Sequence, residues 1–570
     1  MTVLTPIERT AQSAESAPAQ LPQAQVVRSA GIVFVAVLLS RLTGLVREIV
    51  MANRFGAGFA YDSFLLGFRI PNLTRDLFAE GALSSAFIPT FATSLIKQDK
   101  MRASELANLV TSAMLVIVGS FCLLGMWLAP HLVWLLAPGF AGVPGKFALA
   151  VRLTRIMFPF LLLVALAAQS TGMLNSHGSF GVPAIASIFF NIGSVGVGLL
   201  LGYGVGFYFG IAPIEGMAYG VLAGGALQLG WQRAKLRRIG YRFRFVWNWS
   251  HPGLRRIGNL MLPAIIGNLA VQASLIVNTN FASQISDPWR GQDGPVSWLG
   301  YALRFVQVPL ALFGVAIASA LLPTIARSAA AGNFNEFRKT LASSLGTVFL
   351  LTIPSSLILV VLGKPLIGVV YQSGHFNSYD TAQTGLALSC YAVGLVAFST
   401  HRVLNPAFFA LSDARTPMLI SLSSLAVYVA VPQLLLRVWH VGFAALALTT
   451  ALAVTLECLL LAECLRRKLG GLEGRYLRNC FLRIAAAAAV MFFPLLFMHR
   501  HFCALFPETR LGYAAELTIA LPLAGVIFFA AARLLGVAEI RFVHQAFVLP
   551  TWTRFAGLNP LSRLHVKIQS

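Results

Sequence analysis

Long apolar runs alternate with short polar segments from Gly31 to Leu535. A helix needs about 20 apolar residues to cross the hydrocarbon core of a bilayer. A window of that length predicts about fourteen spans, with turn-forming residues in the breaks between them. The predicted starts, each to within about four residues, lie near 30, 61, 106, 151, 181, 214, 257, 297, 341, 381, 417, 442, 481 and 512. The pattern predicts an all-α polytopic membrane protein.

An internal repeat divides the predicted spans. ALSSAFIPTFA (82–92) and AIASALLPTIA (316–326) are identical at six of eleven positions, at an offset of 234 residues. Pro183 and Pro417 stand at the same offset. The offset places the second span on the eighth, an even shift, so the two copies share one orientation. We therefore expect two six-helix lobes related by a parallel repeat, with a central cavity, and two extra C-terminal helices.

The repeat also sets the expected domain boundaries. Residues 1–27 are rich in Ala, Gln and Pro, which predicts a disordered cytoplasmic tail and not a signal peptide. The other predicted parts are an N-lobe (28–240), a C-lobe (241–470), helices 13 and 14 (471–537) and a cytoplasmic tail (538–570).

Charge sets the expected orientation. Membrane proteins gather Lys and Arg in cytoplasmic loops. With the N-terminus inside, the inner loops receive KQDKMR (97–102), RAKLRRIGYRFRF (233–245) and RRKLGGLEGRYLR (466–478). The outer loops hold single basic residues such as Lys146 and Arg290. Both termini are therefore expected in the cytoplasm.

Composition excludes several function classes. The chain is 57% hydrophobic and 11% charged, whereas soluble domains carry about 25% charged residues. The net charge of +23 would suggest nucleic acid in a soluble protein, but no nucleic-acid-binding motif accompanies it. The six cysteines form no CxxC pair, and P-loop, HExxH and GxSxG motifs are absent. We expect no nucleic-acid partner, no cofactor, no metal and no enzyme activity.

One predicted membrane segment is unusually polar, FRIPNLTRDLFAEGALSSAFIP (68–89). On a helix, Asp62, Arg69, Asp76 and Glu80 fall within about 40° of one another, with Asn72 at the edge. The stripe is about 27 Å long, close to the thickness of the hydrocarbon core. It is expected to line a wet interior or to pair with neighbouring helices.

Arginines recur in the spans around this stripe. They are Arg41 and Arg47 in SRLTGLVRE (40–48), Arg75, and Arg304 in YALRFVQVPLALFG (301–314). Each arginine costs about 2.5–3.5 kcal/mol at mid-membrane on insertion scales. One interpretation is packing through ion pairs, such as Arg47 with Glu48 or Asp62. The other is an anion site, because guanidinium binds phosphate oxygens in a bidentate way.

Several motifs resemble the MurJ (MviN) lipid II flippases of the multidrug/oligosaccharidyl-lipid/polysaccharide exporter superfamily. They span about residues 28 to 535 and are SRLTGLVRE (40–48), YDSFLLGFRIPNLTRDLFAEGALSSAFIPTFA (61–92), LTRIMFPF (153–160), RFVQVPLALFGVAIASALLP (304–323), YQSGHFNSYDT (371–381) and ALSDARTP (410–417). The resemblance implies a V-shaped cavity between the lobes and a groove for a long lipid tail on the last two helices.

The resemblance further implies that the chain flips lipid II, an undecaprenyl-pyrophosphate-linked sugar–peptide precursor of peptidoglycan, across the cytoplasmic (inner) membrane by alternating access. Membrane lipids and the cell-wall synthesis machinery are the further expected partners. By position, the family's functional residues correspond to Arg41, Arg47, Arg75, Arg304 and Asp62. The polar stripe adds Arg69, Asn72 and Glu80 to the expected substrate-binding residues.

Three alternatives remain open. A flippase for another polyprenyl-linked saccharide would also need basic residues, but should lack the 68–89 motif. A cation-drug exporter of the same superfamily should have an acidic cavity. A membrane glycosyltransferase or ligase should show a large outer loop with paired carboxylates.

The orientation can be tested with single cysteines. Cysteines at positions 142 and 290 should react from outside with an impermeant thiol reagent, and one at position 240 should not, because only the first two lie in predicted outer loops. Labelling of position 240 from outside would reverse the orientation.

Overall fold

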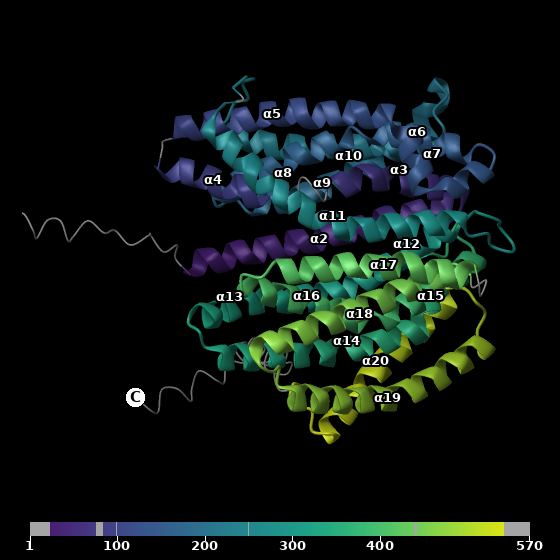
Figure 1. The fold of residues 1–570 in the computed structure, drawn as a ribbon. Coiled ribbons are helices and arrows are strands. Elements are labelled where there is room, and N and C mark those ends of the chain that lie inside the picture. The colour runs from purple at the N-terminus through teal and green to yellow at the C-terminus, as the bar shows by residue number, and fades with distance from the viewer. Residues whose placement is uncertain (1–22, 76–83, 98–99, 249, 438–441, 541–570) are drawn as a thin grey trace, which may run out of the picture. The chain divides into compact units, whose positions relative to one another are not determined.

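The computed structural model describes residues 23–75, 84–97, 100–248, 250–437 and 442–540. Helices are the only regular elements in these ranges (Figure 1). Nine of the described helices are long and apolar enough to cross a membrane, or ten if the pair Ser378–Val393 and Leu395–Ala410, bent by 46°, forms one span. This confirms an all-α, multi-pass class, and the number fourteen stays a prediction.

The helices follow one another in a simple order. They are α2 (Gln23–Phe55), α3 (Phe59–Arg75), α4 (Ser84–Lys97), α5 (Lys100–Trp127), α6 (Ala129–Leu136), α7 (Lys146–Met157), α8 (Phe160–Ser176), α9 (Gly181–Leu199), α10 (Pro213–Arg238), α11 (Pro252–Gln284), α12 (Pro295–Pro309), α13 (Ala316–Ala330), α14 (Phe334–Tyr371), α15 (Ser378–Val393), α16 (Leu395–Ala410), α17 (Arg415–Arg437), α18 (Ala444–Leu469), α19 (Gly474–Leu505) and α20 (Arg510–Leu534). Short 3₁₀ or π turns are η2 (Pro138–Gly142), η3 (Leu200–Gly204), η4 (Val205–Phe209) and η5 (Leu310–Val315).

Every predicted span start lies within seven residues of the first residue of a helix. Six helices, α2, α5, α7, α11, α14 and α19, begin five to seven residues earlier than predicted. A hydropathy window detects only the apolar part of a helix. α14, for example, begins with Phe334 and includes Glu336, Arg338 and Lys339 before its apolar run. The described parts of the two repeat copies lie on α4 and α13, and their symmetry stays a prediction.

The chain divides into two compact units that interleave along the sequence. Unit 1 contains Met1–Glu48, Thr74–Leu124 and Ile156–Ala264, and unit 2 contains Ile49–Leu73, Gly125–Arg155 and Ile265–Ser570. Two segments from the first half of the chain are thus part of unit 2. The lobes predicted at 28–240 and 241–470 stay a prediction.

The core of unit 1 combines large side chains with close backbone contacts. Phe87 and Phe91 of α4 belong to a buried cluster with Leu106 of α5 and Met173 of α8. α9 and α10 approach so closely that a Cβ on Gly224 would lie 2.4 Å from the carbonyl oxygen of Phe190. Small residues allow such approaches between membrane helices, where packing and not hydrophobicity drives association.

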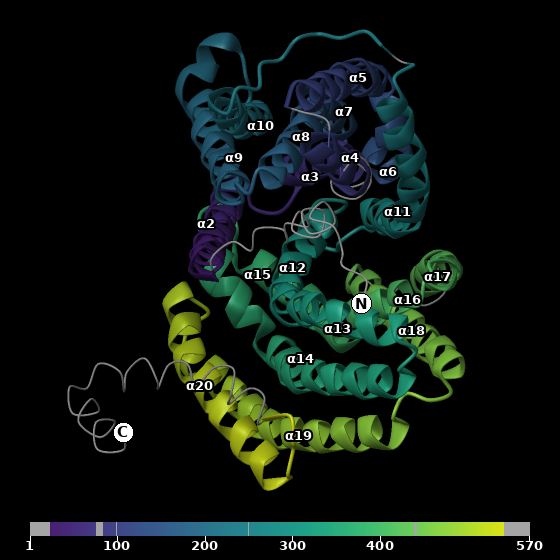
Figure 2. The same ribbon diagram turned by 90° about the vertical axis from the view of Figure 1, so that its left-hand side faces the viewer.

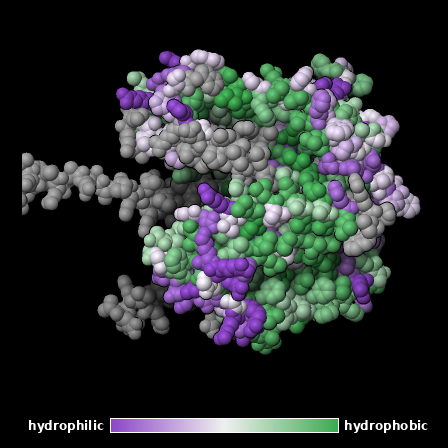
Figure 3. Space-filling model, viewed as in Figure 1, coloured by the Kyte–Doolittle hydropathy of each residue, from purple (hydrophilic) through white to green (hydrophobic). Residues whose placement is uncertain are grey.

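In unit 2, α14 lies between two hydrophobic clusters (Figure 2). Its first half contributes Phe337 and Leu341 to a cluster with α13, α16, α17 and α18. Its middle and second half contribute Leu350 and Leu362 to a cluster with α19 and α20. Figure 3 shows hydrophobic residues along the middle of α17 and α18 and hydrophilic residues where α17 begins and α18 ends. This distribution suits helices that cross a bilayer.

The α9–α10 contact predicts the effect of one added methyl group. Gly224→Ala would place its Cβ against backbone, so the helices must separate, at a cost of about 1–3 kcal/mol. We expect a lower thermal unfolding temperature in detergent. Gly230→Ala on the same helix is the matched control, because nothing lies within 4 Å of its Cβ position. Equal unfolding temperatures for the two variants would contradict the close packing.

Candidate functional site

The residues predicted from sequence are distributed over both units. Arg41 and Arg47 lie on α2 in unit 1, whereas Asp62, Arg69, Asn72 and Arg304 lie on α3 and α12 in unit 2. Arg75 is the last residue of α3, and its side chain lies outside the described part of the chain, as do Asp76 and Glu80.

Asp62 is the centre of a largely buried polar cluster. Its side chain and that of Lys146 are both 0% exposed, and Lys146 Nζ lies 2.8 Å from Asp62 Oδ2. The same ammonium contacts Asp293 Oδ1 at 2.6 Å. The carboxylate of Asp62 also accepts hydrogen bonds from the backbone N–H of Gly294 at 2.9 Å and of Ser297 at 2.8 Å, and from the Ser297 hydroxyl.

These contacts make Asp62 a helix cap supplied from a distant part of the chain. The first N–H groups of a helix have no partner within the helix and carry partial positive charge. α12 begins at Pro295, and Asp62 of α3 meets its first turn. One carboxylate therefore holds α3, α7 and α12 together.

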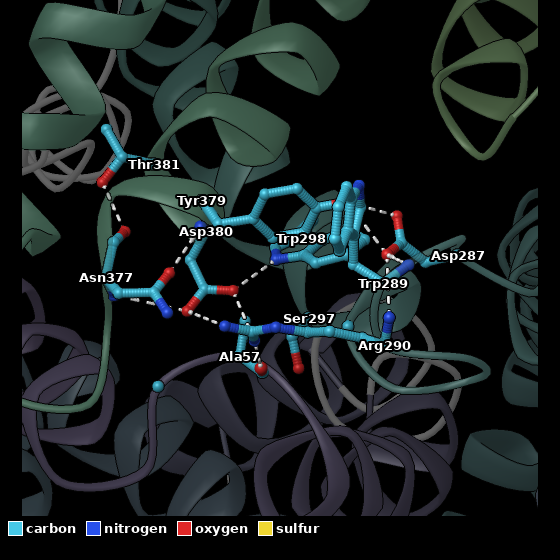
Figure 4. A network of polar contacts seen from close by, with 12 residues as sticks. Ala57, Asp287, Trp289, Arg290, Ser297, Trp298, Asn377, Tyr379, Asp380 and Thr381 are labelled. Carbon is cyan, nitrogen blue, oxygen red and sulfur yellow. Dashed lines mark hydrogen bonds and ion pairs between the residues drawn. The ribbon is translucent and has the colours of Figure 1, made fainter.

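A second network lies in unit 2 at the starts of α12 and α15 (Figure 4). Arg290 contacts Asp380 through both terminal nitrogens, at 2.7 and 3.2 Å, and donates to the carbonyl oxygen of Ala57 at 2.6 Å. Trp298 Nε1 donates to Asp380 Oδ1 at 2.9 Å. The Tyr379 hydroxyl donates to the carboxylate of Asp287 at 2.8 Å.

The two networks occupy the end of unit 2 that is predicted to face outward. Their partners come from both predicted lobes, since Ala57, Asp62 and Lys146 precede residue 240 and Arg290 and Asp380 follow it. Sequence reasoning assigned Lys146 and Arg290 to outer loops but did not connect them with this site. One feature of the sequence could have indicated their role: both are basic residues in loops that contain few others.

Two of the predicted arginines, Arg69 and Arg304, belong to unit 2. Arg69 of α3 donates to the hydroxyl of Thr279 on α11, and its charge interacts with that of Arg304 on α12. Like charges in a poorly hydrated environment repel each other, and a bound anion relieves this repulsion. Binding of an anion by this pair stays a prediction.

The arginines of α2 have different surroundings in unit 1. Arg47 NH2 lies 3.0 Å from Glu48 Oε1, and its guanidinium lies 5.4 Å from the centre of the Phe190 ring. Arg41 is exposed. The local pair of Arg47 agrees with the packing interpretation. Contact with a substrate stays a prediction for all eight residues: Arg41, Arg47, Asp62, Arg69, Asn72, Arg75, Glu80 and Arg304.

Among the described residues, no group of three or more His, Cys, Asp and Glu side chains is placed to hold a metal ion. The arrangement suits binding and conformational change.

Comparison with known proteins identifies a family. The sequence profile described as lipid II flippase MurJ matches residues 51–510. The chain is 30% identical over 512 residues to a probable lipid II flippase MurJ of Buchnera aphidicola subsp. Acyrthosiphon pisum, covering 89% of this chain and 97% of that protein. It is 33% identical over 440 residues to the lipid II flippase MurJ of Burkholderia cenocepacia, covering 76% and 82%.

Solved structures agree in fold. A lipid II flippase MurJ in an inward closed conformation matches with a TM-score of 0.71 and 22% identity, over 88% of this chain and 99% of that one. An inward-facing multidrug transporter of the MATE family matches with a TM-score of 0.63 and 13% identity, over 78% and 99%. At these identities the structural matches establish the fold alone.

Removing one member of the Asp62–Lys146 pair should strongly lower the stability of the protein. Lys146→Met should destabilise the protein by about 3–5 kcal/mol, because it leaves a buried carboxylate without its counter-charge. We expect a lower unfolding temperature, with partial recovery in the double variant Lys146→Met/Asp62→Asn.

The matched control is Arg466→Met, which removes a basic residue from an exposed pair with Glu463. Exposed pairs contribute about 0–1 kcal/mol, so this variant should unfold near the wild-type temperature. Similar shifts for Lys146→Met and Arg466→Met would argue against the buried pair as the main constraint.

Proposed function

The chain belongs to the family of lipid II flippases named MurJ, and on that premise we propose that it carries lipid II from the inner to the outer leaflet of the bacterial cytoplasmic membrane. The match of the family profile over residues 51–510 carries this proposal. The substrate is the undecaprenyl-pyrophosphate-linked sugar–peptide unit of peptidoglycan. The chemistry is transport by alternating access, in which the substrate selects between two conformations.

The pyrophosphate binds at Arg69 and Arg304. Both guanidiniums remain charged at physiological pH, and a planar fork fits phosphate oxygens in a bidentate way. Their mutual interaction in unit 2 supports this assignment. Arg41, Arg47, Arg75, Asn72 and Glu80 complete the path of the head group, and Asp62 acts as a positioning residue through its cap on α12.

The ion-pair networks form the outer gate. Opening this end of unit 2 requires separation of Lys146 from Asp62 or of Arg290 from Asp380. A hydrogen bond to a charged group contributes about 1.5–3 kcal/mol, so the closed gate is stable until substrate binding favours the open form. The expected partners are lipid II, membrane lipids and the cell-wall synthesis machinery.

The last two helices serve the lipid tail. One face of the α19–α20 pair packs on α14. Other positions expose large apolar side chains, among them Phe493, Phe497 and Val526. An undecaprenyl chain is as apolar as these side chains and can lie along them. Both termini are assigned to the cytoplasm, as the loop charges predict.

A drug exporter is the second candidate, because the fold also matches a multidrug transporter. Two interacting arginines disfavour a cationic substrate. Depletion of the protein from its host should cause one lipid-linked precursor to accumulate in the inner leaflet. Accumulation of lipid II supports the proposal, and accumulation of a different saccharide lipid with normal lipid II would overturn it.

Two substitutions of Arg304 should weaken lipid II binding to different degrees. Arg304→Ala removes charge and fork and should weaken lipid II binding by about tenfold or more, whereas Arg304→Lys keeps the charge and should lie between. The measurement is lipid II binding by the purified variants, together with growth of a depleted strain that expresses them.

Arg155→Ala is the matched control, since Arg155 is an exposed arginine that donates to the carbonyl oxygen of Met126. Expression level and unfolding temperature are recorded for each variant, because a packing role for Arg304 would lower both. A stable Arg304→Ala protein with wild-type binding and growth would rule out the contact.

If α19 and α20 bind the lipid tail, deleting them should abolish transport without preventing folding. A chain ending at residue 480 should still fold, because lipid can cover the apolar face of α14 that α19 and α20 leave. It should fail to transport full-length lipid II. Normal transport by this truncated chain would show that α19 and α20 are not needed to bind the lipid tail.

A further inference from the structure

The second half of α4, the first turns of α5 and the start of α11 line a cavity of about 450 Å³ in unit 1. The basic segments next to it in the sequence, KQDKMR (97–102) and RAKLRRIGYRFRF (233–245), are expected in the cytoplasm. We therefore expect the cavity to lie at the level of the lipid head groups of the inner leaflet. The proposed transport of lipid II assigns no role to this cavity.

Two side chains of the cavity can donate hydrogen bonds to an anion. Arg102 of α5 carries a permanent positive charge and N–H donors only. His251, just before α11, accepts a hydrogen bond on Nδ1 from the backbone N–H of Gly253 at 3.1 Å. The neutral ring therefore carries its hydrogen on Nε2, from which it can donate. Together the two groups suit the oxygens of a phosphate.

Three other side chains of the cavity can only accept hydrogen bonds. The Thr93 hydroxyl donates its hydrogen to the carbonyl oxygen of Pro89 at 2.8 Å. The Ser94 hydroxyl donates in the same way to the carbonyl oxygen of Thr90 at 3.0 Å. Because each hydroxyl has a single hydrogen, both oxygens offer a ligand only their lone pairs. The carboxylate of Glu105 adds a negative charge, so the three groups suit a primary ammonium.

The charges of Arg102 and Glu105 do not satisfy each other. Within the described part of the chain, neither side chain forms an ion pair or a hydrogen bond. The two residues are three positions apart on α5, so their Cβ atoms are about 5–6 Å apart, and a basic residue before an acidic one is the less favourable order for a helical pair. Unpaired opposite charges at this spacing suit a ligand that carries both signs of charge a short distance apart.

Part of the cavity is apolar. Leu106 is buried and lines the cavity together with Pro252. A Cβ on Gly253 would lie 2.8 Å from Cδ1 of Leu106, so the start of α11 approaches α5 this closely only because residue 253 is a glycine. This lining suits a ligand with carbon groups next to its charges.

We propose that the cavity binds a zwitterionic phospholipid head group with a primary ammonium, as in phosphatidylethanolamine of the inner leaflet. The phosphate accepts hydrogen bonds from Arg102 and His251. The ammonium donates to Glu105 and to the hydroxyl oxygens of Thr93 and Ser94. The short ethylene link between phosphate and ammonium matches the spacing of the two charged side chains on α5.

The same contacts discriminate against other phospholipids. Phosphatidylglycerol has no cation to offer Glu105 and brings a negative charge close to its carboxylate. The trimethylammonium group of phosphatidylcholine has no N–H to donate to the acceptor oxygens. One bound head group connects α4, α5 and the start of α11. This inference goes beyond the proposed flippase function and does not rest on it.

The test measures lipid binding to the purified full chain in detergent by native mass spectrometry. Phosphatidylethanolamine, phosphatidylglycerol and phosphatidylcholine with the same acyl chains are supplied in equal amounts, and the first bound lipid is identified. The wild type should prefer phosphatidylethanolamine. Glu105→Gln removes the contact with the ammonium and the repulsion of anionic lipid, so it should shift the ratio of phosphatidylethanolamine to phosphatidylglycerol by about tenfold toward phosphatidylglycerol.

Arg102→Gln should instead lower the binding of both lipids, because both carry the phosphate. The matched control is Arg238→Gln, which removes an exposed arginine of unit 1 in the last turn of α10, outside the cavity, and should keep the wild-type ratio. Unfolding temperatures are recorded for each variant. If Glu105→Gln is poorly folded, Thr93→Val removes an acceptor oxygen with the carboxylate retained and should shift the ratio in the same direction.

Three results would overturn the lipid site. They are a wild type without preference for phosphatidylethanolamine, a folded Glu105→Gln protein with the wild-type ratio, and equally tight binding of glycerophosphoethanolamine, which lacks the acyl chains and would assign the cavity to a soluble ligand. None of these measurements involves lipid II, so the proposed function stands or falls separately.

Discussion

The buried contact between Asp62 and Lys146 is the constraint on which the outer end of unit 2 depends. It joins residues 84 positions apart, and the same carboxylate reaches backbone N–H groups more than 230 positions further along the chain. Neither charge is exposed, so neither group can exchange its partner for water. The geometry is complete only when α3, α7 and α12 are all in place, because an unpaired charge there would be strongly destabilising.

Charges in unit 2 are used in two opposite ways. Opposite charges in contact, as in Arg290 with Asp380, hold helix starts together and are satisfied within the protein. Like charges, as in Arg69 and Arg304 of unit 2, are the groups that we propose bind the anionic head group. A transporter needs both kinds of charge. If the residues that close the protein differ from those that bind the substrate, the protein can open without losing its affinity for the substrate.

Energy input imposes a further requirement. Alternating access moves substrate uphill only if a second ligand biases the two conformations differently. The buried Asp62–Lys146 pair suits a clamp between helices and not such a ligand site.

The sequence alone determined the class of the protein and the approximate starts of fourteen of the nineteen described helices. The free energy of moving an apolar segment into lipid depends on the residues of that segment alone. Apolar runs of membrane length can therefore be recognised without knowledge of the fold. The hydropathy window did not detect the first turns of helices such as α14, because the residues of these turns are helical but polar. The arginines of the candidate site were also visible, since charge in an apolar run is costly wherever its partner lies.

Only the tertiary structure decided which charges meet. Lys146 and Arg290 look like ordinary loop residues in the sequence, and their partners Asp62 and Asp380 lie 84 and 90 positions away. Asp62 was predicted on a polar stripe, but its environment depends on the start of α12, which no local pattern near residue 62 encodes. His401 of α16 and Glu457 of α18, which also form a pair, likewise stand on different helices. Pairing of buried charges is a long-range property, because its energy exists only once separate helices have brought both groups out of water.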